Sequence, residues 1–79
     1  MFTKELEQAG HSKRFTIHEV PGQGWEVREE IDREVVRLVR YRDWHRVERA
    51  RMRIDAEVLA LEDRGWSTTQ AEPGQSTKR

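Results

Sequence analysis

The chain has 79 residues, with 15 lysine and arginine residues against 15 aspartate and glutamate residues, and it contains no cysteine. This length allows one small domain and excludes a large enzyme with a deep cavity, and the lack of cysteine excludes disulfide-stabilised modules and thiolate metal sites. No apolar run approaches the roughly 20 residues of a membrane span, and the N-terminal segment lacks the apolar centre of a signal peptide, so we expect a soluble, cytoplasmic protein with no membrane partner.

The two ends of the chain are polar, and we expect neither of them to fold. Residues 1–13 are interpreted as a flexible N-terminal arm, and residues 67–79 as a disordered C-terminal tail without a large apolar side chain. Residues 14–66 then form the domain. A unit of this size and composition buries little apolar surface by itself, which favours a second copy or a partner that completes the core.

Three segments alternate apolar and polar residues, as half-buried strands do. They are residues 14–20, 25–31 and 35–41, of which the third is rich in β-branched residues. Short turn-forming segments separate them at residues 21–23 and 32–33. The sequence therefore predicts three antiparallel strands joined by two hairpin turns.

The lengths of these turns determine which residues lie opposite each other. A three-residue turn places Ile17 opposite Val27, and a two-residue turn places Val27 opposite Leu38 and Glu29 opposite Val36. On one face, which we expect to form the core, this register gathers Phe15, Ile17, Trp25, Val27, Ile31, Val36 and Leu38. On the outer face it gathers Thr16, His18, Glu26, Arg28, Glu30, Val35, Arg37 and Val39.

A long helix is predicted from Trp44 to Arg64. Its apolar residues recur in a single stripe with the period of an α-helix, at Val47, Ala50, Ile54, Val58 and Leu61. Asp43 suits the N-cap, Gly65 suits the left-handed position that follows a helix, and Trp66 falls where a Schellman motif packs an apolar residue. We place this helix on the apolar face of the sheet, which gives an α+β fold with a three-stranded antiparallel sheet and the element order βββα.

The segment Val20-Pro21-Gly22-Gln23-Gly24-Trp25-Glu26-Val27, followed by a helix, resembles a family of small uncharacterised bacterial proteins. The layout of that family is a strand, a second strand that begins Gly-Trp-x-Val, and a helix. The resemblance covers residues 20–27 and the order of the elements. It implies a small bacterial domain, and it implies no functional residue.

The residue types that carry catalysis or bind metals are poorly placed for either task. His11, His18 and His45 share no helix face and lack the spacing of metal ligands, and His18 is better explained by a pair with Glu26 across a hairpin. A catalytic or small-molecule site around His45 and Asp43 is the weakest hypothesis, because Asp43 already serves as the N-cap. We therefore expect no catalytic residue, no metal site and no cofactor, and we do not expect an enzyme.

Arginines are concentrated around the start of the predicted helix. Six of them lie within residues 40–53, where the acidic residues are only Asp43 and Glu48. Such a cluster binds phosphates, so one hypothesis is a nucleic-acid-binding module that uses Arg42, Arg46, Arg49 and Arg53. The zero net charge disfavours nucleic-acid binding, and the balanced outer face disfavours binding through the sheet, whereas binding through the helix stays an alternative. The alternative is that the arginines pair with the acidic residues of segments 19–34 and 54–63, in the same chain or in a second one.

The charges along the helix favour a different hypothesis. The first half is basic and the second half acidic, which is the reverse of what the helix dipole favours. Two antiparallel helices, related by a two-fold axis near residues 54–56, would set each basic half against the acidic half of the other copy. A second apolar strip, made of Met52, Ala56 and Leu59 and bordered by Trp44, is available for this contact. We therefore favour a protein-interaction or assembly module that forms a homodimer; the alternative is that Met52 and Leu59 are singly exposed apolar residues without a role.

Overall fold

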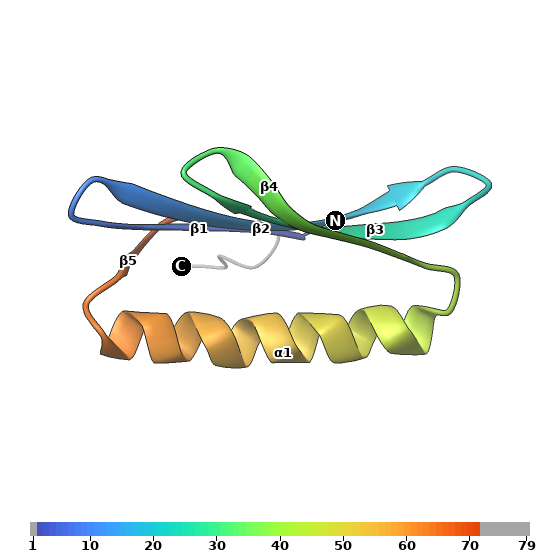
Figure 1. Ribbon diagram of the computed structural model, residues 1–79. Helices are drawn as coiled ribbons and strands as arrows, with labels where there is room; N and C mark the ends of the chain where they lie inside the picture. The colour runs from blue at the N-terminus through green and yellow to red at the C-terminus, as the bar shows by residue number, and fades with distance from the viewer. Residues whose placement is uncertain (1, 72–79) are drawn as a thin grey trace.

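The structure, a computed structural model, describes residues 2–71. Its elements in chain order are β1 (Phe2–Gln8), β2 (His11–Val20), β3 (Gly24–Ile31), β4 (Glu34–Tyr41), α1 (Trp44–Asp63) and β5 (Ser67–Ala71). The strands form one antiparallel sheet in the order β4-β3-β2-β1-β5. Helix α1 lies along one face of this sheet, which we call the helix face (Figure 1). No described element covers the opposite, open face.

The predicted α+β class is confirmed, but the predicted three-stranded sheet is wrong, because the sheet has five strands. Strands β2, β3 and β4 contain the three predicted strand segments, and α1 is the predicted helix. Strand β1 occupies most of the segment 1–13 that we expected to be an arm, and β5 occupies the start of the expected tail 67–79. Residues 72–79 of that tail lie outside the described residues.

Strand β1 is held in the sheet by two buried side chains. Phe2 and Leu6 are 2% and 0% exposed, and both belong to the core between the sheet and α1. They stand four residues apart, so they lie on the same face of the strand. A tight turn at Ala9 and Gly10, both with positive φ, then joins β1 to β2. With only two large apolar residues in seven positions, β1 has a weak strand pattern, and burial in the core determines its structure.

Both ends of α1 have the predicted capping arrangement. The Asp43 side chain accepts a hydrogen bond from the backbone N–H of His45 at 3.0 Å. At the other end, Gly65 has a φ of 101°, and the backbone N–H of Trp66 donates to the carbonyl oxygen of Leu61 at 3.0 Å. This is the Schellman arrangement, which fixes where the helix stops and turns the chain back toward β5.

One apolar cluster fills the space between α1 and the sheet. Its buried members are Phe2, Leu6, Phe15, Ile17, Val27, Val47, Ala50, Ile54, Val58 and Leu61. The predicted helix stripe is buried throughout, and Phe15, Ile17 and Val27 are buried as predicted. Trp25 is partly buried against the cluster. The remaining sheet residues that we assigned to the core, Ile31, Val36 and Leu38, are exposed.

A β-bulge explains why the predicted core assignment fails in β4. The two-residue turn at residues 32–33 is confirmed, but the register of β3 and β4 then shifts by one residue. Val27 consequently lies opposite Val39 and not opposite Leu38. Since side chains alternate between the two faces, this shift turns Leu38 to the open face and brings Arg37 and Val39 to the helix face, the reverse of the prediction.

Candidate functional site

Strand β4 forms one edge of the sheet and carries exposed apolar side chains. Within residues 2–71, β4 pairs only with β3, so the backbone groups on its outer side have no strand partner. Val35, Val36 and Leu38 are 53%, 55% and 48% exposed, and Ile31 at the end of β3 is 40% exposed. We call these four residues and the outer backbone of β4 the β4 edge. An exposed apolar edge strand is a surface to which another extended chain can add.

The sequence reasoning missed the β4 edge because it assigned Val36 and Leu38 to the core. A signal was nevertheless present, since four of the five residues 35–39 are large and apolar. Only alternate residues of a regular strand reach one face, so this run contains more apolar residues than the core can take. Such a run in a half-buried strand indicates either a bulge or an exposed apolar surface, and β4 has both.

A basic surface of α1 lies beside the end of β4. The residues that line a shallow hollow of about 370 Å³ at this place are Tyr41, Arg46, Arg49, Ala50 and Arg53. Arg42, in the link between β4 and α1, is also exposed. We call Arg42, Arg46 and Arg49 the arginine flank. In the described part of the chain these three arginines form no ion pair, so their charges remain available to a partner.

The other arginines of the cluster make contacts within the chain. Arg53 donates two N–H groups to a carboxylate oxygen of Glu29, each at 3.4 Å, which ties α1 to β3. Arg40 donates a hydrogen bond to Glu26 at 3.3 Å. The guanidinium of Arg51 lies over the ring of Phe2. Pairing within the chain therefore accounts for part of the predicted cluster, and it removes Arg53 from the residues free to bind phosphate.

The predicted dimer strip lies on the outer surface of α1. Met52 and Leu59 are 69% and 67% exposed, and Ala56 between them is exposed as well. Trp44 is displaced toward the sheet, where its ring lies 5.2 Å from the ring of Trp25. The strip is thus a narrow row of three small or flexible side chains, with Trp44 to one side of it.

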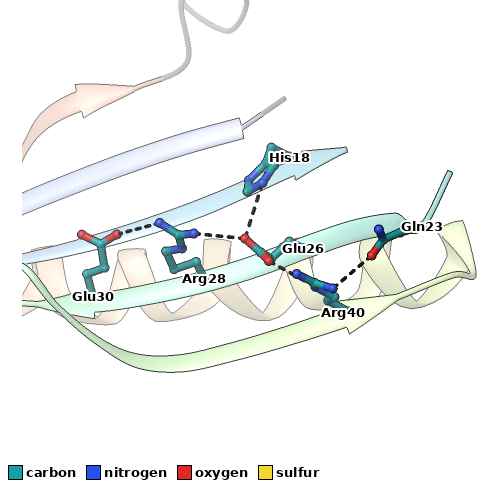
Figure 2. Close-up of polar contacts among 6 residues, drawn as sticks. All are labelled: His18, Gln23, Glu26, Arg28, Glu30 and Arg40. Carbon is teal, nitrogen blue, oxygen red and sulfur yellow. Dashed lines mark hydrogen bonds and ion pairs between the residues drawn. The ribbon is translucent and has the colours of Figure 1, made fainter. Parts of the chain in front are cut away.

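A buried carboxylate lies on the open face of the sheet. Glu26 is 5% exposed, and it accepts hydrogen bonds from Arg28 at 3.1 Å and from Arg40 at 3.3 Å. The Nε2 atom of His18, directly opposite on β2, is 3.4 Å from Glu26. Figure 2 shows these side chains converging on Glu26, with Gln23 and Glu30 at the ends of the network. The predicted His18–Glu26 pair is therefore present, but its carboxylate is covered by the two arginines and the histidine.

The surroundings of Glu26 favour its charged form. Burial raises the pKa of the Glu26 carboxyl group, but the hydrogen bonds from Arg40 and Arg28 and the charge of His18 together outweigh burial and hold the pKa below its ordinary value. The network neutralises its own charges across three strands. The open face therefore lacks the basic character that a nucleic-acid-binding sheet needs.

A second set of hydrogen bonds fixes the hairpin that presents the β4 edge. The Asp32 carboxylate accepts from the backbone N–H of Ser12 at 3.0 Å and lies 3.1 Å from Nδ1 of His11. The bond from Ser12, followed by that from His11, lowers the pKa of Asp32. Asp32 and Arg33 both have positive φ, which is unfavourable for residues other than glycine. The contacts to β2 compensate for this strain and hold the hairpin in place.

Across residues 2–71, no group of three or more histidine, cysteine, aspartate or glutamate side chains is arranged to hold a metal ion. In the same part of the chain, no helix is both long and apolar enough to cross a membrane. Comparison with family models, curated proteins and solved structures finds no match to the chain. The resemblance of residues 20–27 to small bacterial proteins therefore stays a prediction, and any function has to be argued from the surfaces described above.

Proposed function

We propose that the chain is a protein-interaction module that binds an extended, acidic segment of a partner protein along the β4 edge. The observation that carries this proposal is the position of the exposed apolar edge strand directly beside the unpaired arginine flank. A partner segment in extended conformation would add to the sheet as a sixth strand, and its backbone would hydrogen-bond to the outer backbone groups of β4.

The two faces of the sheet set the side chains that such a segment needs. Residues of a strand point alternately to the two faces. On the open face, the side chains of an added strand would contact Val35 and Leu38, which favours apolar residues. On the helix face they would approach Arg46 and Arg49, which favours aspartate or glutamate. A segment that alternates acidic and apolar residues fits both requirements.

A second copy of the chain is a poorer occupant of the same edge. Strand β4 contains Arg37 and Arg40 against the single acid Glu34, and the arginine flank follows it directly. Two β4 strands paired antiparallel would set each arginine flank beside the start of the partner's β4, where Glu34 is the single acid of the strand, so a second copy offers these arginines fewer carboxylates than an acidic segment does. The charges of this edge therefore favour an acidic partner over self-association.

Homodimerisation through α1 is the second candidate, and the exposure of Met52 and Leu59 supports it. This strip shares no residue with the β4 edge, so the two surfaces can be tested independently. Sedimentation velocity at tens of micromolar separates the alternatives. The helix dimer requires a two-fold larger particle that dissociates when Leu59→Glu is introduced, whereas a monomer that is unaffected by Leu59→Glu contradicts it.

The proposal is tested with a synthetic probe peptide of eight residues that alternates glutamate and valine, titrated into the ¹⁵N-labelled chain. We expect chemical-shift changes at residues 34–41 and at the arginine flank. A peptide that alternates lysine and valine has the same strand pattern with the opposite charge, and it should bind at least tenfold more weakly. Equal binding of both peptides, or shifts confined to the outer surface of α1, would overturn the proposal.

Matched variants identify the contacts. Leu38→Ser and Arg49→Gln should each weaken binding of the glutamate–valine peptide. Leu59→Ser and Arg64→Gln, which change comparable exposed side chains away from β4, should not. Nucleic acid is the remaining alternative for the arginine flank. If a short duplex or single strand displaces the peptide, with an affinity that falls steeply with salt, phosphate binding is the better account of these arginines.

A further inference from the structure

A cleft of about 490 Å³ opens between the first half of α1 and the sheet, where β1 begins and β2 ends. Its aromatic residues are Phe2, Trp25 and Trp44, and its charged helix residues are Glu48, Arg51 and Asp55. It shares no residue with the β4 edge or with the arginine flank. The volume is in the range of cavities that bind small molecules.

Three aromatic rings contribute to the lining of this cleft. The rings of Trp25 and Trp44 pack against each other, with centroids 5.2 Å apart and planes inclined by 55°. The face of an aromatic ring is electron-rich and attracts cations, most strongly when the ring is tryptophan. The chain already has one such contact in the cleft, since the guanidinium carbon of Arg51 lies 4.8 Å from the centroid of the Phe2 ring.

The rim of the cleft has an excess of carboxylates. Glu19 and Asp55 form no ion pair with any other described residue, and Glu48 reaches only His45, at 3.8 Å. The arginine of the lining, Arg51, lies over the ring of Phe2 and keeps its positive charge there. Three acidic side chains therefore stand against one arginine, so the lining of the aromatic cavity carries a net negative charge.

We propose that this cleft binds a small organic cation with an alkylated ammonium group. The alkyl groups would lie against Trp25 and Trp44, and the positive charge would be attracted by the ring faces and by Glu19 and Asp55. A metal ion is the less suitable occupant, because hard cations need several oxygen ligands at close range and the described residues form no such group. An alkylated ammonium ion is weakly hydrated and loses less on entering an apolar cavity.

The test compares choline with 3,3-dimethylbutan-1-ol, a neutral molecule of almost the same shape. Choline is titrated into the ¹⁵N-labelled chain, and the indole N–H signals are followed. We expect the signals of Trp25 and Trp44 to shift, while that of Trp66, which lies outside the cleft, stays in place.

The neutral alcohol should bind at least threefold to tenfold more weakly, because it lacks the charge that the rings and carboxylates attract. Equal or tighter binding of the alcohol would overturn the proposal, and so would unmoved Trp25 and Trp44 signals at 100 mM choline.

Two variants then assign the parts of the cleft. Trp44→Leu keeps an apolar wall but removes the ring face, and Glu19→Gln removes one rim charge, so each should weaken choline binding by several-fold. Glu34→Gln, an exposed acid on β4 outside the cleft, is the control and should leave the affinity unchanged. Unchanged affinity in Trp44→Leu, with the fold intact by circular dichroism, would contradict the assigned role of the ring. If Trp44→Leu does not fold, the comparison of choline with the alcohol on the unaltered chain still decides the proposal.

Discussion

Leu38 of β4 lies directly opposite Arg28 of β3, so both side chains stand on the open face of the sheet. Arg28 is held there by Glu26, whereas Leu38 remains 48% exposed. The bulge in this strand pair thus places a residue with the chemistry of a core on the surface, next to an unpaired strand edge. This relationship, together with the arginine flank, defines the surface that we propose as the binding site.

Engineered disulfides test the register that produces this arrangement. The chain has no cysteine of its own, so a pair of introduced cysteines has no competing partner. We expect Val27→Cys with Val39→Cys to form a disulfide, because these residues lie opposite each other on the helix face. Val27→Cys with Leu38→Cys should stay reduced, since the side chains point to opposite faces. Mass spectrometry after mild oxidation shows which of the two cysteine pairs forms a disulfide. A disulfide between positions 27 and 38, and none between 27 and 39, would support the predicted register without a bulge.

The parts of the fold that the sequence predicted are those in which many residues repeat one signal. Helix α1 has five stripe residues, an N-cap aspartate and a Schellman glycine, all in agreement. Strand β5, with the sequence STTQA, has no large apolar residue, and its pairing with β1 depends on backbone groups that any sequence supplies. The bulge in β4 was not predicted, because a hairpin without a bulge also places apolar residues, Val36 and Leu38, on the core face.

The candidate surfaces also differ in how far the sequence could predict them. The outer strip of α1 could be predicted, because the period of the helix indicates which residues face away from the core, and Met52 and Leu59 are exposed as expected. The β4 edge was indicated only by its apolar run at residues 35–39, and that run does not specify the one-residue shift in pairing that exposes Leu38. The aromatic cleft was beyond sequence reasoning as well, since it joins Phe2, Trp25 and Trp44 from three separate elements.

Strand β1 should contribute strongly to stability. Leu6 is fully buried, and we expect Leu6→Ala to lower the free energy of unfolding by about 2–5 kcal/mol, as large-to-small substitutions in cores do. The matched control, Leu59→Ala, changes the same residue type on the exposed surface and should alter stability by no more than about 0.5 kcal/mol. Urea denaturation of both variants measures the difference. Two equal, small effects would mean that residues 1–8 are an unfolded arm after all.

The Glu26 network predicts a loss of stability in acid. Because the pKa of Glu26 is lower in the folded chain than its ordinary value, the unfolded chain binds the proton first as the pH falls. The stabilisation by this carboxylate is therefore complete when the pH is above the ordinary pKa of glutamate. It is lost as the pH falls toward the lower pKa that Glu26 has in the folded chain. Asp32, whose pKa is also lowered, adds to this loss in the same direction.

Glu26→Gln should lower the melting temperature at neutral pH, because it leaves Arg28 and Arg40 without their carboxylate. It should also flatten the decline in melting temperature as the pH falls below the ordinary pKa of a glutamate, relative to the unaltered chain. Glu34→Gln, an exposed acid without an ion pair in the described part of the chain, serves as the control and should keep the steep decline. Thermal unfolding monitored by circular dichroism across this pH range provides the measurement. An equally steep decline in Glu26→Gln and in the control would refute the role of the network.

The turn between β2 and β3 should tolerate substitution at one glycine better than at the other. Gly22 has a φ of 76° and open space around it, so Gly22→Ala should cost about 1–2 kcal/mol for the left-handed backbone alone. Gly24 has a φ of 102°, and a Cβ atom there would collide with the carbonyl oxygen of Tyr41 at the end of β4. Gly24→Ala should therefore destabilise the chain by clearly more than Gly22→Ala in the same urea titration. Equal effects would show that the turn does not pack against β4.

The most direct test of the β4 edge is hydrogen exchange at the backbone amides of residues 34–41, with and without the peptide that alternates glutamate and valine. In an edge strand, alternate N–H groups point outward, so every second amide of β4 should exchange rapidly in the free chain. On saturation with the peptide, our account predicts that these same amides become protected while the exposed surface of α1 does not change. Protection that is absent from β4, or that arises only on α1, would contradict it.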